Sequence, residues 1–270
     1  MKQMSKLGRT VAAYGDWSRT LLWLKQILYP AKCLKCNVYM TPRQTRKPLP
    51  EDSFCPVCLA DGWDGIDPPY CILCGIQLPG AAAPNHVCGP CLKTPLNMGK
   101  VRAAVEYKGL AKDAISLFKY HSKLSLCRLF ESMMFQTFAR HFDPLQIDLL
   151  MPVPLHPKKL KHRGFNQAFL LVRSFEKISV QQNGCPPPWQ IDLNSLERQK
   201  ETRSQTGLDI GLRKKNLKGA FHLRDESRIK GKTILLIDDV LTTGATCNEA
   251  ARLLLEKGAQ RVDALVLARA

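Results

Sequence analysis

The stretch ILLIDDVLTTGAT, at Ile234–Thr246, contains the features that decide the fold. Its apolar beginning, Ile234–Ile237, predicts a buried β-strand, and two adjacent acids, Asp238 and Asp239, follow that strand. The chain then enters a predicted helix near Thr246. Because a helix start offers free backbone N–H groups and a partial positive charge, this junction predicts a phosphate-binding site.

The two acids indicate that the ligand is more than a phosphate. Carboxylates would repel a phosphate unless they contact another part of the ligand, and a sugar diol supplies two hydrogen-bond donors to them. The junction therefore predicts a sugar phosphate, with its hydroxyl groups on Asp238 and Asp239 and its phosphate in the loop formed by Thr242, Thr243, Gly244, Ala245 and Thr246. The alternative is an ordinary N-capped helix, which leaves the adjacent acids unexplained.

Strand and helix patterns alternate through the C-terminal two thirds of the chain. Strands are predicted at 101–107, 148–153, 233–237 and 261–267, and helices at 110–120, 126–142, 166–175 and 246–257. This alternation predicts an α/β fold with a mostly parallel sheet flanked by helices. Ligands bind such sheets at the carboxyl ends of the strands, where Asp238 and Asp239 are placed.

The N-terminal part of the chain is rich in cysteine. Eight of the 11 cysteines form four C-x-x-C pairs, at Cys33, Cys36, Cys55, Cys58, Cys71, Cys74, Cys88 and Cys91. Two such pairs complete a tetrahedral shell of four sulfur atoms, which suits zinc, so the pattern predicts two structural zinc ions. Pairing in sequence order is the simplest assignment, and interleaved pairing stays open. Disulfides would need an oxidising compartment, and iron–sulfur clusters are disfavoured because no run of three closely spaced cysteines occurs.

Three cysteines fall outside these pairs, and we interpret Cys127, Cys185 and Cys247 as buried packing residues. His86 is an alternative metal ligand because it lies two residues before Cys88, although a surface role is favoured.

The composition predicts three segments: an amphipathic helix at 1–30, a double zinc ribbon at 31–98 and the α/β domain at 99–270.

The net charge of +17 and the pI of about 9.5 favour polyanionic partners, such as nucleic acid, nucleotides, phosphates or an anionic membrane. The apolar stretch Leu21–Tyr29 is too short to span a bilayer and has no small-residue cleavage site behind it, so Trp17–Tyr29 is interpreted as an amphipathic helix. We therefore expect a cytoplasmic protein without a membrane span.

The stretch at Ile234–Thr246 resembles the PRPP-binding motif of type I phosphoribosyltransferases. Two further segments, Met151–Ala168 and Thr202–Phe221, resemble signatures of the ComF (GntX-like) family, whose members also carry an N-terminal double zinc ribbon. The resemblance covers nearly the whole chain. It implies a type I phosphoribosyltransferase fold, Mg²⁺, and PRPP or ribose 5-phosphate as ligand. It also implies a link to competence and DNA uptake, with single-stranded DNA and DNA-processing proteins as partners, or a role in nucleotide metabolism.

The resemblance assigns roles to further residues. Val153–Pro157, which includes Val153 and Pro154, would hold the diphosphate, and the cations that follow it, among them Lys158 and Arg163, would neutralise it. Thr202–Asn216 would be a mobile hood that contributes Arg203 and Arg213 to the reacting centre. Asp238 and Asp239 would hold the ribose hydroxyls and act in catalysis. The resemblance leaves open whether the protein is an active transferase or a non-catalytic PRPP sensor or DNA-handling factor.

Overall fold

The structure is a computed structural model that describes residues 30–41, 48–80, 84–201 and 217–270. The chain divides into two compact units, Met1–Leu59 and Ala60–Ala270. The amphipathic helix predicted at 1–30 falls almost wholly outside the described residues. The predicted boundary near residue 98 lies inside the second unit, and the assignment of separate ribbon and transferase domains stays a prediction.

The described part of the first unit contains little regular structure. It has a short 3-10 helix, η1 (Pro50–Asp52), and one helical turn, α2 (Pro56–Leu59), together with an isolated bridge between Lys32 and Tyr39. Its buried side chains are mainly Phe54 and cysteines, so a small core surrounds the first cysteine pairs.

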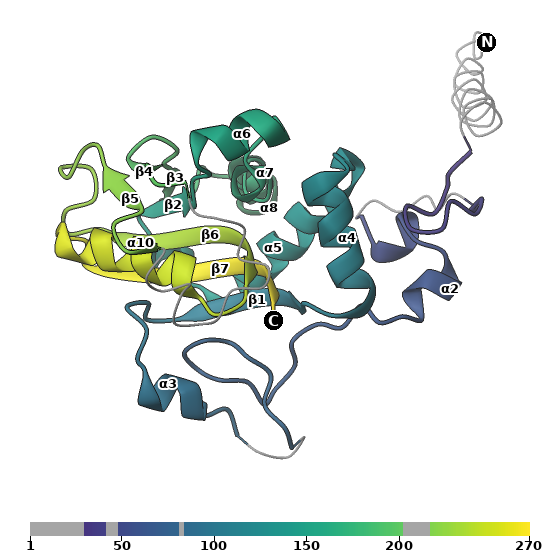
Figure 1. Cartoon of the computed structure of the whole chain (residues 1–270), viewed down its shortest axis with the longest axis horizontal. Helices are drawn as coiled ribbons and strands as arrows, with labels where there is room; N and C mark the ends of the chain where they lie inside the picture. The colour runs from purple at the N-terminus through teal and green to yellow at the C-terminus, as the bar shows by residue number, and fades with distance from the viewer. Residues whose placement is uncertain (1–29, 42–47, 81–83, 202–216) are drawn as a thin grey trace, which may run out of the picture. The chain divides into compact units, whose positions relative to one another are not determined.

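The second unit is built on a five-stranded sheet in which every paired strand is parallel (Figure 1). The strands lie in the order β1 (Val101–Glu106), β7 (Arg261–Arg269), β6 (Thr233–Leu241), β2 (Leu149–Pro152) and β3 (Gln190–Ile191). A separate antiparallel pair consists of β4 (Leu196–Arg198) and β5 (Phe221–Leu223). The predicted parallel α/β fold is confirmed.

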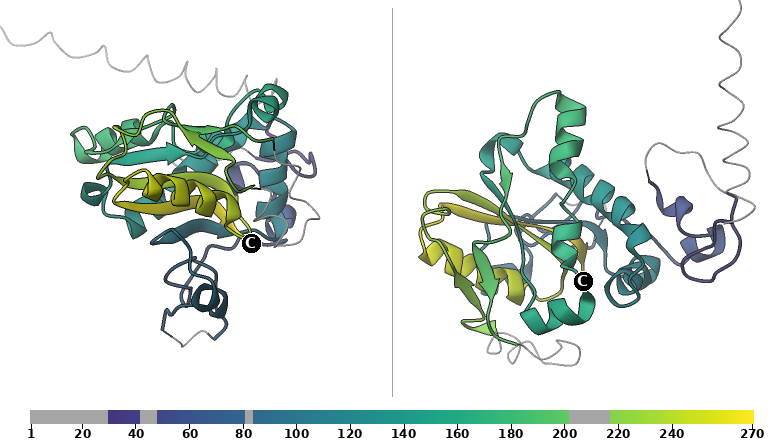
Figure 2. Two further views of the ribbon diagram at one scale, coloured as in Figure 1. Left: turned by 60° about the vertical axis from the view of Figure 1, so that its left-hand side comes forward. Right: turned by 90° about the horizontal axis from the view of Figure 1, so that it is seen from above.

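Helices cover both faces of this sheet, as the two views of Figure 2 show. α10 packs on β6 and β7 on one face, whereas α5 contacts β1 and β7 and α7 contacts β6. Alternate residues of β6 face α10, so Ile234 and Leu236 belong to the core that includes Ala250 and Leu254 of α10. Among the described residues, the helices of this unit are α3 (Gly89–Lys93), α4 (Gly109–Tyr120), η2 (Leu124–Leu126), α5 (Cys127–His141), η3 (Pro144–Gln146), α6 (Pro157–Arg163), α7 (Gln167–Leu170), α8 (Phe175–Asn183) and α10 (Ala245–Glu256).

Several boundaries differ from the sequence-based expectation. β6 runs through Asp238 and Asp239 to Leu241, because β7 is also longer than predicted and continues to pair with it up to Arg269. The basic residues after the predicted loop Val153–Pro157, for which no helix was expected, form α6, which starts at Pro157 and ends before Gly164 in the left-handed conformation. The single helix expected at 166–175 is instead α7, which ends at Leu170, and a separate α8.

The strand order places a topological switch point between β2 and β6. The chain leaves β2 toward β3 on one side, and it leaves β6 toward β7 on the other side. Outgoing connections that diverge in this way leave a crevice at the carboxyl ends of the two strands, where α/β proteins bind ligands. None of the helices within the described ranges has the length and apolar character needed to cross a membrane.

Candidate phosphate-binding and metal sites

The two predicted acids lie at the carboxyl end of β6 and are half-buried. Asp238 Oδ1 accepts a hydrogen bond of 2.8 Å from the backbone N–H of Asp239, and Oδ2 lies 3.6 Å from the thiol of Cys247 in α10. Burial, followed by the charge of Asp239, raises the pKa of Asp238 to about 7. A carboxyl group held so far from its ordinary pKa beside a second carboxyl is typical of a functional site.

Lys119, which sequence reasoning did not single out, neutralises the second acid. Its ammonium nitrogen lies 2.7 Å from Asp239 Oδ1, and the side chains are only 14% and 13% exposed. Burial alone would lower the pKa of Lys119, but the charge of Asp239 outweighs burial and raises it. The pair joins the end of α4 to the end of β6, and no local sequence pattern could have identified partners so far apart in the chain.

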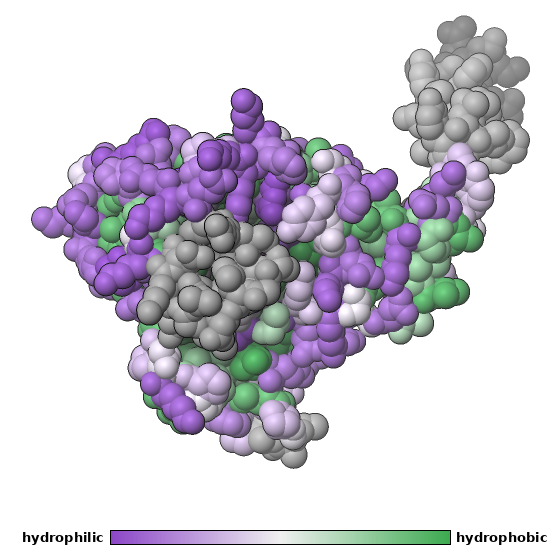
Figure 3. Space-filling view, viewed as in Figure 1, coloured by the Kyte–Doolittle hydropathy of each residue, from purple (hydrophilic) through white to green (hydrophobic). Residues whose placement is uncertain are grey.

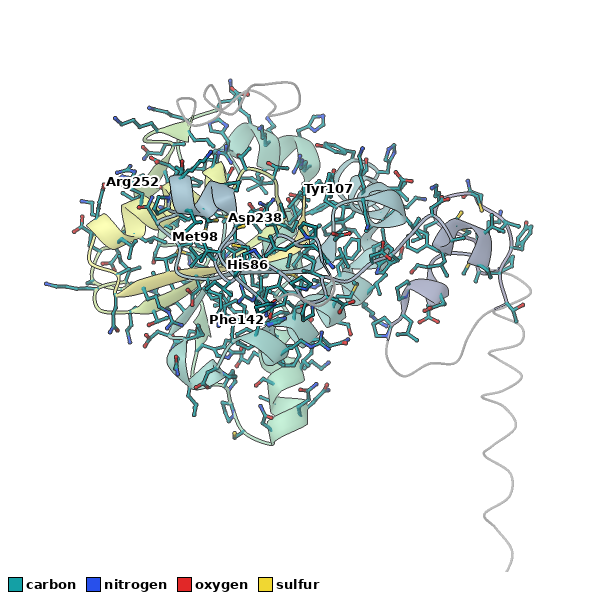
Figure 4. All side chains as sticks on the ribbon, turned by 90° about the horizontal axis from the view of Figure 1, so that it is seen from below. His86, Met98, Tyr107, Phe142, Asp238 and Arg252 are labelled. Atoms are coloured by element: carbon teal, nitrogen blue, oxygen red, sulfur yellow. The ribbon has the colours of Figure 1, made fainter. Side chains whose placement is uncertain are left out.

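The predicted phosphate loop, Thr242–Thr246, connects β6 to α10. Gly244 is the N-cap of α10 and has a φ of +74°, so the left-handed conformation explains the glycine. A Cβ atom there would meet Leu241 and Met98 at 3.6 and 3.9 Å, which is ordinary contact. Met98 is labelled in Figure 4. The backbone conformation at this position therefore accounts for the glycine.

The second predicted loop, Val153–Pro157, lies beside the first at the switch point. The backbone N–H of Val153 donates to the carbonyl of Ile237, the residue before Asp238, at 2.8 Å. Asn166 fixes the loop from the other side, since its side-chain amide donates to the carbonyl of Val153 at 3.2 Å. The structure thus places Val153, and Pro154 after it, beside the end of β6 that carries the two acids.

Cations gather near this second loop, and hydrophilic side chains cover the region around α6 in Figure 3. Burial, followed by the charges of Arg198 and Arg163, lowers the pKa of Lys159. Burial also lowers the pKa of Arg198, which Asp238 partly offsets. Arg163 packs over the ring of Tyr120, next to Lys119, with 5.1 Å between guanidinium and ring centroid. The charges of Arg163 and Arg198 disfavour the charged form of Lys159, and an anion bound between these cations would offset that repulsion.

Not every predicted residue joins this group. Lys158 is exposed and forms an ion pair of 2.6 Å with Glu201. Arg203 and Arg213 lie outside the described residues. Instead, Arg198 lies near Asp238, and Lys159 lies near Arg198 and Arg163. Lys159 stood in a recognisable basic run, whereas Arg198 has no sequence signal because its proximity to Asp238 depends on the β4–β5 pair.

The eight cysteines form two separate clusters, each paired in sequence order as predicted. The first cluster consists of Cys33, Cys36, Cys55 and Cys58, and the second of Cys71, Cys74, Cys88 and Cys91; within each, the sulfur atoms lie within 4.8 Å of one another. Four sulfur donors with no further ligand suit a closed structural zinc site. Burial and the neighbouring thiols raise the pKa of Cys91, and a bound cation would remove this cost of collecting four thiolates.

The three remaining cysteines and His86 differ in how far they are buried. Cys127 and Cys247 are buried as expected, but Cys185 is exposed, so the prediction of a buried role for Cys185 was wrong. His86 is exposed, and its Nδ1 lies 3.0 Å from the carbonyl of Pro84. The ligand set of the second cluster contains four cysteines and not His86.

Comparison with known proteins shows which family the chain belongs to. The phosphoribosyl transferase domain family matches residues 187–270, which contain the acids and the phosphate loop. The chain is 32% identical over 202 residues to the DNA utilization protein YhgH of Salmonella typhimurium, covering 74% of this chain and 83% of that protein. It is 31% identical over 210 residues to competence protein F of Haemophilus influenzae, covering 75% and 85%.

The chain belongs to the ComF family. Competence protein ComFC of Bacillus subtilis, at 29% identity, aligns over 248 residues, 88% of this chain and 94% of that protein. The ComF resemblance, predicted from three short segments and the cysteine pairs, is thereby confirmed. A solved hypoxanthine phosphoribosyltransferase from Staphylococcus aureus matches with 15% identity and a TM-score of 0.28, over 54% of this chain and 61% of that one. This similarity is too low to assign any site residue of the ComF protein.

Proposed function

We propose that this ComF protein binds PRPP, or ribose 5-phosphate, with Mg²⁺ at the carboxyl ends of β6 and β2. The single observation that carries the proposal is the composite site at the switch point. It combines the paired acids, a loop that opens into a helix start, and a group of half-buried and buried cations. Each component suits one part of PRPP: the 5-phosphate, the ribose diol or the diphosphate.

Different groups of residues would bind the different parts of PRPP. The start of α10 and the hydroxyls of Thr242 and Thr243 take the 5-phosphate, since free N–H groups attract anions. Asp238 and Asp239 accept hydrogen bonds from the ribose diol. Lys159 and Arg198 neutralise the diphosphate. Burial disfavours the charged forms of both side chains, so an anionic partner stabilises them more than it would stabilise exposed cations.

The donor set at β6 fits Mg²⁺, which prefers carboxylate and phosphate oxygens. Asp238 and Asp239 would hold the ion together with oxygens of the ligand, and the ion would supply positive charge to the departing diphosphate. Lys119 already neutralises Asp239, so the pair carries less repulsion toward phosphate than two free acids would.

Transfer of the ribosyl group needs no protein nucleophile. As the bond from C1 of the ribose to the diphosphate breaks, the sugar gains positive charge, which the nearby carboxylates stabilise. The cations near the Val153–Pro157 loop hold the leaving diphosphate. By analogy with its relatives, named for competence and for DNA utilization, the protein would act in DNA uptake, DNA use or nucleotide metabolism.

The alternative function is a non-catalytic PRPP sensor or a factor that handles single-stranded DNA. The net charge of +17 favours it, because a basic protein attracts nucleic acid. Binding of DNA would then be largely electrostatic, and the affinity should fall steeply between low and moderate salt. PRPP binding without diphosphate release in the presence of acceptor bases would favour this alternative.

Calorimetry with PRPP and Mg²⁺ tests the proposal. We expect the parent protein to bind, and Lys159→Gln to bind at least about tenfold more weakly, because a charge-assisted hydrogen bond contributes roughly 1.5–3 kcal/mol. Lys161→Gln is the matched control, since Lys161 lies in the same helix, α6, and is exposed. No binding by the folded parent protein would refute the proposal.

A further inference from the structure

Arg269, at the end of β7, connects the phosphate loop to the second cysteine cluster. Its Nη1 donates to the carbonyls of Leu241 and Thr242 at 3.0 and 2.7 Å. Its Nε donates to the carbonyl of Cys74 at 3.3 Å, and its Nη2 lies 4.0 Å from the sulfur of the same cysteine. One guanidinium group therefore contacts both a metal-site residue and the segment that leads into the phosphate loop.

The two carbonyls that Arg269 holds determine where the loop's donors point. The peptide group is planar and trans, so its N–H points opposite to its carbonyl. When Arg269 fixes the carbonyl of Thr242, it directs the N–H of Thr243 away from the cysteine cluster. The carbonyl of Leu241 fixes the N–H of Thr242 in the same manner. These N–H groups lie at the entrance to α10, where we propose that the phosphate binds.

Other residues beside the second cluster reach the same loop. The backbone N–H of Asn97 donates to the side-chain oxygen of Asn248, in the first turn of α10, at 2.7 Å. The buried Met98 side chain faces the position of Gly244. Leu96 packs against both the cysteine cluster and the core beneath α10. The segment that follows Cys91 thus supports α10 from its first turn.

The cysteine cluster is in turn fixed to the sheet. The backbone N–H of Val101, at the start of β1, donates to the carbonyl of Leu73 at 2.7 Å, and Arg102 donates to the carbonyl of Ile72 at 3.1 Å. Gly75 has a φ of +68°, and a Cβ atom there would lie 2.7 Å from the carbonyl oxygen of Val101. The knuckle therefore packs against β1 too closely for any side chain at position 75.

We infer that the second cysteine cluster, when it holds its metal, positions the phosphate loop through Arg269, so that metal occupancy there controls affinity for the phosphorylated ligand. Cys74 contributes its sulfur to the metal site and its carbonyl to Arg269. Loss of the metal frees the knuckle, displaces the Cys74 carbonyl and releases Arg269 from Leu241 and Thr242. Arg269 is a positioning residue in this scheme, and the inference rests on the proposed PRPP site for its effect on affinity.

The first test is hydrogen–deuterium exchange of the full-length, metal-loaded protein without ligand. Arg269→Gln should raise the exchange rate of amides in residues 240–247 by at least about tenfold, since loss of hydrogen bonds to a charged group opens the segment by that factor. Zinc content should stay at the parent value. Arg261→Gln, at the opposite end of β7, is the matched control and should leave this segment unchanged. Equal exchange in Arg269→Gln and the parent would overturn the inference, whether or not PRPP binds.

The second test compares the two clusters by PRPP calorimetry. Cys91→Ser, in the second cluster, should lower PRPP affinity at least about tenfold, whereas Cys58→Ser, in the first, should leave it unchanged. The double variant Cys91→Ser/Arg269→Gln should bind as the weaker single variant does, because both changes break one connection. Additive losses, or equal losses from Cys58→Ser and Cys91→Ser, would overturn the inference. A parent protein that fails to bind PRPP would refute the proposed function alone, since the exchange experiment still decides the role of Arg269.

Discussion

The ammonium group of Lys119, at the end of α4, lies 2.7 Å from the carboxylate of Asp239, near the end of β6. This ion pair is mostly buried, and it leaves Asp238 as the acid whose charge is not directly paired with a cation in the described residues. The two adjacent acids therefore have different roles before any ligand arrives. Asp239 is held in place by Lys119, whereas burial and the charge of Asp239 raise the pKa of Asp238 to about 7.

Breaking the Lys119–Asp239 pair should destabilise the fold. Asp239→Asn leaves a buried ammonium group without its counter-charge, so we expect a loss of about 3 kcal/mol in the free energy of unfolding. Lys119→Met should also lower the free energy of unfolding, because it leaves the carboxylate of Asp239 without its cation. The double variant should be more stable than the sum of the single changes predicts. Urea denaturation measures all three, and strictly additive losses would show that the pair does not contribute.

The raised pKa of Asp238 predicts a pH dependence of stability. The folded protein keeps the Asp238 proton up to about pH 7, whereas the unfolded chain releases it near its ordinary pKa of about 3.9. The contribution of protonated Asp238 to the free energy of unfolding is therefore fully present below about pH 4, and it is lost as the pH rises through about 7. Asp238→Asn removes this dependence. The variant should gain stability relative to the parent between pH 5 and pH 8, and a difference that is constant with pH would contradict the assignment.

The same titration should affect ligand binding in the opposite direction. The ribose diol donates hydrogen bonds, so the ionised form of Asp238 is the better acceptor. PRPP affinity should rise as the pH increases through about 7, where Asp238 loses its proton. Asp238→Asn should bind more weakly and with a flatter pH profile in calorimetry between pH 6 and pH 8. An affinity of the parent protein that falls over this range would contradict a role for ionised Asp238.

Gly244 should tolerate alanine poorly because of its backbone conformation. A non-glycine residue in the left-handed region costs about 1–2 kcal/mol, and the φ of +74° is fixed by the start of α10. Gly244→Ala should therefore lower the free energy of unfolding by this amount and weaken phosphate binding. Gly65→Ala is the matched control, since no atom lies within 4 Å of its Cβ position and its φ is not in that region. Equal melting temperatures for the two variants would refute this explanation.

The two cysteine clusters should each bind one zinc ion. Elemental analysis of protein purified without chelator should return two zinc ions per chain, because each cluster supplies four sulfur donors. Cys36→Ser and Cys88→Ser should each reduce the content to about one, since the clusters share no ligand. Iron in place of zinc, or loss of both ions from a single substitution, would contradict two independent structural sites.

The sequence alone was sufficient to predict the fold class, the ComF family and the metal clusters. The reason is that these features depend on short-range patterns. An apolar run followed by Asp238, Asp239 and a threonine–glycine loop defines a strand, a turn and a helix start within a few residues. The C-x-x-C spacing brings two sulfur atoms together by local backbone geometry. Which pairs share a cluster stayed open in the sequence, and the structure groups them in sequence order, the simplest assignment.

Only the tertiary structure decided which residues complete the site. Lys119 reaches Asp239 because α4 ends beside β6, and Arg198 approaches Asp238 because β4 pairs with β5. Likewise, Arg269 contacts Thr242 and Cys74 because β7 extends to pair with the last residue of β6. Contacts between segments distant in the chain arise from strand order and helix packing, which one sequence does not encode in any local pattern. The sequence therefore determined the chemistry available at the end of β6, and the packing of the sheet determined which charges surround it.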